Sequence, residues 1–157
     1  MTAPITRALV ADHHRLGALL AAAERGDRAS YFLLRSGLLR HIEIEEKILL
    51  PALRAAAQEL PMAQQLRLDH AAIAAMLVPS PTPALLEALR ILLALHDPVE
   101  EAPNGLHPLA DRELTSPDDV LLCIACTPLP ALAAHFDGPQ AFEAIADRTA
   151  RAREHRG

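Results

Sequence analysis

Four segments of the sequence carry apolar residues at the three- and four-residue steps of an α-helix, and each has one histidine within its apolar stripe. Successive histidines are 28, 29 and 26 residues apart, so short connections between antiparallel helices would bring all four to a similar level. This pattern predicts an up-down-up-down four-helix bundle with four histidines directed toward its interior. The four are His13, His41, His70 and His96.

The helix boundaries follow from residues that start and stop helices, because proline suits a first turn and glycine a C-terminal cap. We expect helices over about residues 4–26, 28–57, 61–78 and 82–101. Pro51 is expected to kink the second of these helices. Pro98 removes one backbone hydrogen bond from the fourth and is expected to bend it.

The composition favours an all-α fold. Apolar residues make up 51% of the chain and aromatic residues 3%, and the apolar residues are mainly alanine and leucine, which are strong helix formers. Shorter helices are expected near residues 107–111, 116–126 and 141–153. We therefore expect a four-helix bundle over residues 1–115, with residues 116–157 as a C-terminal helical extension packed on it, in a single domain.

Two of the four histidines have a glutamate four residues later. Glu45 follows His41 and Glu100 follows His96, and residues four apart lie on the same face of a helix. A buried, unpaired Glu45 would be strongly destabilising, so a cation should compensate its charge. Imidazole and carboxylate ligands without a thiolate suit iron, manganese or zinc. Two carboxylates on facing helices can bridge a pair of such ions, and the four histidines could complete their coordination.

Other polar residues near these motifs are assigned to simpler roles. His107 and Asp111 are also four residues apart, but helix capping or surface pairing is the preferred interpretation for them. His14 lies off the apolar stripe of its helix and is expected either on the surface or in an outer contact to the site. Glu46 is assigned to the solvent side, although its angle on the helix is close to that of the site-facing residues.

The last third of the chain holds two further candidate motifs. Cys123 and Cys126 form a C-x-x-C pair without the second Cys or His pair of a zinc site and without the strand context of a redox site. They are interpreted as small buried apolar residues. The basic segment 148–156 is interpreted as a solvated helix end.

Charge and hydropathy narrow the classes of partner and location. A net charge of -5 argues against a nucleic-acid-binding face, which would need a basic stripe. The sequence has neither an apolar run long enough for a membrane span nor the pattern of a signal peptide. Two cysteines are too few for a disulfide-stapled secreted fold. We therefore expect a cytoplasmic protein with no nucleic-acid or membrane partner.

Several segments resemble the hemerythrin-like proteins that contain the HHE cation-binding domain. The resemblance covers about residues 5–115 and is most specific in the stretch His-Ile-Glu-Ile-Glu-Glu-Lys-Ile-Leu-Leu-Pro over residues 41–51. The other matching segments are Asp-His-His-Arg-Leu at 12–16, Leu-Asp-His-Ala-Ala-Ile at 68–73, His-Asp-Pro-Val-Glu-Glu at 96–101 and Leu-His-Pro-Leu-Ala-Asp at 106–111. The resemblance implies that four histidines and two glutamates bind a non-haem di-iron centre, with the glutamates as bridges. Those residues are His13, His41, His70, His96, Glu45 and Glu100.

The implied function is the binding of dioxygen or a related small molecule such as nitric oxide, in a carrier, sensor or iron-handling role. Manganese or zinc could substitute for the two iron ions. Two alternatives stay open at this point. The same centre could catalyse peroxide or iron oxidation or a nitric-oxide-linked repair, or the chain could be a metal-free helical interaction module that has lost the site.

Overall fold

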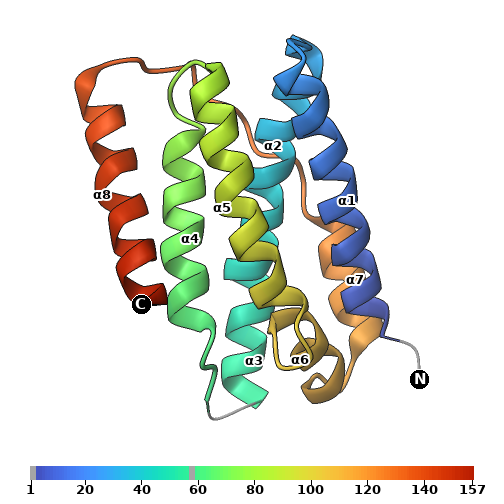
Figure 1. Cartoon of the computed structure of the whole chain (residues 1–157). Helices are drawn as coiled ribbons and strands as arrows, with labels where there is room; N and C mark the ends of the chain where they lie inside the picture. Colours follow the sequence, from blue (N-terminus) through green and yellow to red (C-terminus); the bar gives the residue numbers. More distant parts are fainter. Residues whose placement is uncertain (1–2, 57–58) are drawn as a thin grey trace.

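The computed structural model describes residues 3–56 and 59–157, and these residues form helices and connecting segments without a β-strand (Figure 1). The all-α prediction is therefore confirmed. The predicted end of the second long helix at Ala57 lies outside the described residues. The helical elements are α1 (Pro4–Glu24), α2 (Arg28–Ile44), the π-helical turn η1 (Glu45–Leu49), α3 (Leu50–Ala56), α4 (Ala63–Met76), α5 (Pro83–Glu101), α6 (Leu106–Glu113), α7 (Pro117–Cys126) and α8 (Pro139–Arg156).

The long helices α1, α2, α4 and α5 lie side by side, and the remaining helices pack around them (Figure 1). α8 packs along α4, α7 lies against α1, and α6 contacts α1, α3 and α5 near one end of the molecule. After α7 the chain runs the length of the molecule to reach the start of α8. Among the described residues, no helix is long and apolar enough to cross a membrane.

The apolar core is divided into two clusters, and each long helix passes from one cluster to the other at its histidine. In α1, Leu9 belongs to one cluster and Leu16 to the other, with His13 between them. In α2 the order of the clusters is reversed, with Leu38 before His41 and Ile44 after it. The histidines therefore form a polar layer between two apolar layers.

Pro51 is accommodated by a π-helical turn in front of it. The turn covers Glu45–Leu49, and the amide of Leu50 donates to the carbonyl oxygen of Glu45, five residues earlier. Proline has no amide hydrogen, and its ring clashes with the carbonyl four residues before it, so a wider turn relieves that contact. Pro98 lies inside α5, which continues through Glu101.

The structure corrects the assignment of the two cysteines, because both Cys123 and Cys126 are exposed. α7 lies on the surface against α1 and η1, and it buries only the face that carries Ile124. The two cysteines lie on other faces of this ten-residue helix. Asp111 has the predicted capping role, since its carboxylate accepts hydrogen bonds of 2.9 Å from the amides of Ile5 and Thr6 at the start of α1.

A close backbone contact at Gly105 positions α6 against the end of α5. A Cβ atom here would lie 2.5 Å from the carbonyl oxygen of Val99 and would also overlap the carbonyl of Glu100. The amide of Gly105 donates to the carbonyl oxygen of Ala102 over 2.6 Å. Only glycine permits this approach, so the path of the chain into α6 depends on it.

Gly105→Ala is expected to lower the free energy of unfolding by about 1–3 kcal/mol, because the added methyl group must displace backbone. Urea denaturation of the metal-free protein measures this change. Gly17→Ala is the matched control, since a Cβ there would have nothing within 4 Å and Gly17 lies inside α1. The control should be neutral or stabilising by up to about 1 kcal/mol. Equal effects of the two substitutions would contradict the role assigned to Gly105.

Candidate metal centre

The polar layer brings the six predicted site residues together with a seventh, His107. Their ligand atoms form two groups, and within each group one ligand atom per residue lies within 4.8 Å of the others. Either group could hold a metal ion. Glu45 and Glu100 belong to both groups. The first group contains His13, His41, Glu45, Glu100 and His107, and the second contains Glu45, His70, His96 and Glu100.

Glu45 presents one carboxylate oxygen to each group. Its Oε1 atom lies 3.2 Å from Nε2 of His41 and 2.7 Å from Nε2 of His107, both of which belong to the first group. Its Oε2 atom lies 3.1 Å from Nε2 of His70, which belongs to the second group. Glu45 is fully buried at the start of the π-helical turn. Its position is therefore that of a bridge between two sets of imidazoles.

Glu100 has the same arrangement on the opposite helix. Its Oε2 atom lies 3.2 Å from Nε2 of His13 in the first group. Its Oε1 atom lies 2.8 Å from Nε2 of His96 and 3.4 Å from Nε2 of His70 in the second. Glu100 is fully buried even though Pro98 precedes it in α5. The proline does not remove this carboxylate from the site.

His107 was not predicted to contact the site, yet its side chain is fully buried there. It comes from α6, which is outside the four long helices whose periodicity identified the other histidines. The available signal was its place in the segment Leu-His-Pro-Leu-Ala-Asp, which is one of those that resemble the hemerythrin-like proteins. Spacing alone assigned His107 to helix capping or surface pairing, whereas the turn at Gly105 places it beside Glu45.

The four histidines of the long helices are each oriented by an outer carboxylate. Because a carboxylate only accepts, Nδ1 of each ring carries the hydrogen and Nε2 is directed toward the centre. This is the usual arrangement of metal-binding histidines, whose second nitrogen donates to a carboxylate. The Nδ1–carboxylate distances are 2.6 Å for His13–Glu101, 2.7 Å for His41–Asp12, 2.8 Å for His70–Glu46 and 3.1 Å for His96–Asp69.

The outer carboxylates close a ring around the site. Each one is next in sequence to one site residue but hydrogen bonds to a histidine of a different helix: Asp12 on α1 reaches α2, and Asp69 on α4 reaches α5. Likewise Glu46 on η1 reaches α4, and Glu101 on α5 reaches α1. Adjacent residues of a helix differ by about 100° in direction, so a neighbour of an inward residue faces the next helix. The assignment of Glu46 to the solvent side was therefore wrong.

The C-terminal helix also contributes to these outer contacts. The guanidinium Nη2 of Arg156 contacts Oδ2 of Asp69, and Gln65 Nε2 donates to Oδ1 of Asp69 over 2.9 Å. The interpretation of the basic segment 148–156 as a solvated helix end is thus wrong for Arg156, because α8 packs along α4 and carries this side chain to Asp69. His14 is exposed, which is the first of the two placements expected for it.

The residues of the centre are suited to bind a cation, because their buried hydrogen-bond acceptors, which are imidazole nitrogens and carboxylate oxygens, face one another. Nε2 of His13 lies 3.0 Å from Nε2 of His41, and neither nitrogen carries a hydrogen when Nδ1 does. Among the described residues, Oε2 of Glu45 and Oε2 of Glu100 are buried without a hydrogen-bond partner. Buried acceptors without donors are destabilising. A bound cation would satisfy all of them.

Without a metal cation, protons bound to the histidines supply the positive charge of the centre. Burial and the charge of Glu100 would raise the pKa of Glu45, but the neighbouring histidines outweigh them and hold it well below its ordinary range. Burial would lower the pKa of His41, but the charge of Glu45 and the hydrogen bond to Asp12 raise it to about 10. The pKa of His96 is raised to about 9 against burial, by the charge of Glu100 and the bond to Asp69. The metal-free centre therefore holds protons on its histidines.

Asp69→Asn is expected to weaken metal binding by about 10- to 100-fold, because it removes the charge that orients His96. Equilibrium dialysis of the full chain against manganese(II) measures the change. Asp147→Asn is a matched control, because Asp147 is an exposed aspartate on α8 that pairs with Arg151. An Asp69→Asn protein that binds the metal as tightly as the control would contradict the orienting role.

Comparison of the chain with protein-family models, with curated proteins and with solved structures found no match. The inference of function therefore depends on the residues of the site and on their arrangement.

Proposed function

We propose that this chain is a hemerythrin-like protein whose centre holds two non-haem iron ions and binds dioxygen or a related small molecule such as nitric oxide. The observation that carries the proposal is the division of the two buried carboxylates, since Glu45 and Glu100 each present one oxygen to each group of histidines. Carboxylates that bridge two ions have this arrangement.

The number of donors supports two ions rather than one. Seven side chains converge, and their carboxylate oxygens face two separate sets of imidazoles. A single zinc ion would need only four ligands and would leave the others buried without partners. Imidazole and carboxylate donors without thiolate suit iron or manganese. Iron is the metal that the sequence resemblance implies.

The two groups differ in their number of donors, and this difference supports a ligand-binding role. The first group offers three imidazoles and two carboxylate oxygens, whereas the second offers only the imidazoles of His70 and His96 with the same two carboxylates. An iron pair at this site would supply a free coordination position for a diatomic ligand on the side of His70 and His96. Both histidines are buried, at 4% and 3% exposure, so only a small ligand would fit there.

The up-down-up-down four-helix bundle belongs to the same proposal. It is supported by the alternating order in which successive long helices cross the two apolar clusters. The ring of outer hydrogen bonds also connects the helices in the cyclic order α1, α2, α4, α5. Residues 1–115 would then form the bundle, while α7 and α8 would form its C-terminal extension.

Metal analysis and anomalous scattering test the proposal directly. Protein produced with added iron and purified anaerobically without chelator should contain about two iron ions per chain, as expected for a bridged pair. Anomalous difference density at the iron edge should show two peaks, one beside His41 and one beside His96. A single peak, or a chain free of metal whose thermal stability does not respond to chelation, would contradict the proposal.

Rapid mixing separates binding from turnover. A diferrous protein that binds without turnover should form one adduct per centre with dioxygen or nitric oxide and release it on dilution. Repeated consumption of dioxygen or peroxide would instead support the enzymatic alternative. Both readouts depend on the same centre, so His96→Ala should abolish either one.

A further inference from the structure

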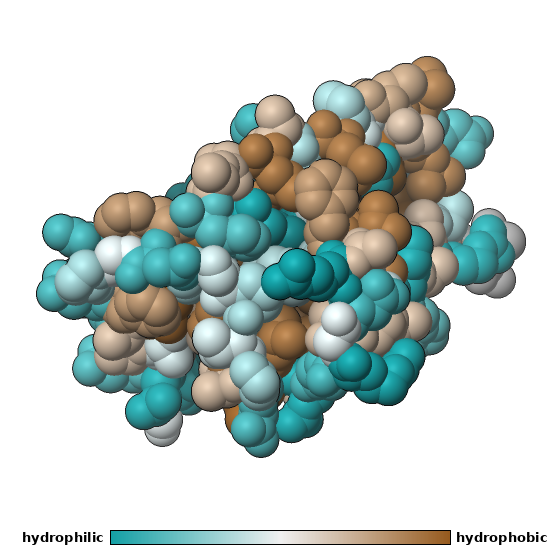
Figure 2. Space-filling view, turned by 90° about the horizontal axis from the view of Figure 1, so that it is seen from above, coloured by the Kyte–Doolittle hydropathy of each residue, from teal (hydrophilic) through white to brown (hydrophobic). Residues whose placement is uncertain are grey.

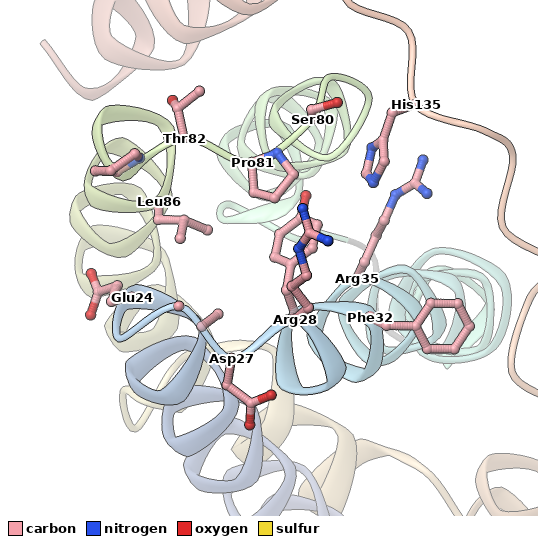
Figure 3. A pocket seen from close by; sticks show the side chains of 14 residues that line it. Glu24, Asp27, Arg28, Phe32, Arg35, Ser80, Pro81, Thr82, Leu86 and His135 are labelled. Carbon is pink, nitrogen blue, oxygen red and sulfur yellow. The ribbon is translucent and has the colours of Figure 1, made fainter.

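A cavity of about 530 Å³ lies at the opposite end of α2 from the metal centre. Figure 3 shows it from close by. It is lined by the turn between α1 and α2, the first turns of α2, the connection between α4 and α5, and His135. Tyr31 in its lining precedes His41 by ten residues, which is about 15 Å along a helix. The volume is in the range of small-molecule sites. Figure 2 shows this end of the molecule, where apolar and hydrophilic residues lie side by side.

Two arginines in the lining have no anionic partner among the described residues. Arg35 is only 8% exposed, and its Nε and Nη1 atoms donate to the carbonyl oxygens of Leu77 and Ala133, each over 2.8 Å. These carbonyls hold the guanidinium in place but carry only partial charges. Arg28 is exposed at the rim and forms no ion pair within the described chain. A buried cation without a counter-charge favours an anionic ligand.

The two acidic residues of the lining are already engaged elsewhere. Glu24 pairs with Arg90, with Oε1 3.2 Å from Nε. Asp27 caps α2 and accepts hydrogen bonds from the amide of Ala29 over 3.1 Å and the hydroxyl of Ser30 over 2.7 Å. Figure 3 shows the Asp27 carboxylate pointing away from the space between Leu86, Pro81 and Thr82. The unpaired charge that lines the cavity is therefore positive.

The rest of the lining is mainly apolar and contains one unmet hydrogen-bond donor. Ala23 and Leu86 are buried, and Pro81 and Pro83 add further apolar surface. The ring of Tyr31 stacks with that of His135 at a centroid distance of 6.0 Å. The Tyr31 hydroxyl is buried without a hydrogen-bond partner in the described part of the chain. Such a group is destabilising unless a ligand or solvent satisfies it.

We propose that this cavity binds a small amphipathic carboxylate, with its apolar or aromatic body against Leu86, Ala23 and the Tyr31 ring. Its carboxylate would accept hydrogen bonds from the guanidinium groups of Arg28 and Arg35, a pairing that suits the planar geometry of both partners. The site is separate from the metal centre and does not depend on the proposed iron pair.

Titration of the full-length protein with naphthalene-2-carboxylate, followed by calorimetry and by NMR chemical shifts, tests the proposal. Binding is expected with a dissociation constant below about 1 mM, equivalent to about -4 kcal/mol or tighter. The uncharged naphthalene-2-carboxamide should bind at least about ten-fold more weakly because it cannot form the charged contacts. Equal affinities for the two compounds, or shifts confined to residues outside the lining, would overturn the proposal.

Two variants separate a binding role from a structural one. Arg28→Gln should weaken carboxylate binding by about ten-fold, whereas the matched control Arg25→Gln, in the same turn but outside the lining, should not. Tyr31→Phe should weaken binding, because the carboxylate would lose a hydrogen bond from the Tyr31 hydroxyl, while thermal stability stays constant or rises, because that hydroxyl has no partner among the described residues. His41→Ala should bind the carboxylate normally. Unchanged affinity in Arg28→Gln would overturn the assignment.

Discussion

Replacing Glu45 with Gln is expected to empty both halves of the metal centre, because its two oxygens face different groups of histidines. The amide keeps the size of the side chain but lacks the negative charge and one acceptor oxygen. Iron content should fall from about two ions per chain to near zero, since each ion of a bridged pair loses a ligand. Glu100→Gln should have the same effect. Elemental analysis of anaerobically purified protein measures the loss.

Histidine variants should behave differently, and the difference tests the division into two groups. His96→Ala removes a donor only from the group that already has fewer, so about one ion per chain should remain. Glu43→Gln is the matched control for Glu45→Gln, because Glu43 lies two residues earlier at the end of α2 but pairs with the exposed Lys47 over 2.6 Å. The control should keep both ions. A half-loaded Glu45→Gln protein would show that Glu45 belongs to one ion only.

The sequence predicted the part of this centre that depends on helical periodicity. A histidine inside an apolar stripe must face the interior, because the stripe is the face that packs. A carboxylate four residues later must share that face, which identified Glu45 and Glu100. These arguments use only the geometry of one helix, so they succeed for residues of α1, α2, α4 and α5. They hold for Glu100 as well, because α5 continues past Pro98 to Glu101.

His107 and the outer carboxylates could not be predicted in this way because they depend on contacts between elements. His107 enters the site through the backbone contact at Gly105, which is a feature of the turn rather than of any periodicity. Asp69 lies next to His70 in sequence but orients His96, so its role depends on the relative rotation of two helices. An acidic residue adjoins five of the site residues, and four of these acidic neighbours orient a histidine, whereas Asp97 beside His96 does not. That repeated pairing was an available signal once the inward residues were known.

The exposure of Cys123 and the contact of Arg156 depend on how α7 and α8 pack against the long helices. The sequence constrains this packing less than it constrains the packing of the long helices themselves. Both helices carry mixed polar and apolar faces, and their positions follow from the surface that the long helices leave free. α7 leaves Cys123 exposed, whereas α8 carries Arg156 to Asp69. Local amphipathicity indicates that such helices exist but not which partner their polar ends will meet.

The free energy of unfolding of the metal-free protein is expected to fall as the pH rises from about 6.5 to 10. In the folded state the pKa of His41 is raised to about 10 and that of His96 to about 9, from an ordinary value of 6.5. A group whose pKa is higher in the folded state stabilises the fold fully below its unfolded pKa, and this stabilisation is lost as the pH passes the folded pKa. Between these pH values the folded chain must therefore lose the histidine protons that compensate the charges of the buried carboxylates. The free energy of unfolding should fall by several kcal/mol as a result.

The metal-loaded protein should lose little stability over the same interval, because a bound metal holds the imidazoles deprotonated in the folded state and the unfolded histidines are neutral above about pH 6.5. Stabilisation by the metal should therefore grow with pH over the same interval. Urea denaturation at pH 6, 7.5 and 9, with chelator and with manganese(II), measures both slopes. His41→Ala should flatten the slope of the metal-free protein, because it removes the group with the pKa of about 10. A metal-free protein as stable at pH 9 as at pH 6 would show that the histidines of the empty centre are not protonated.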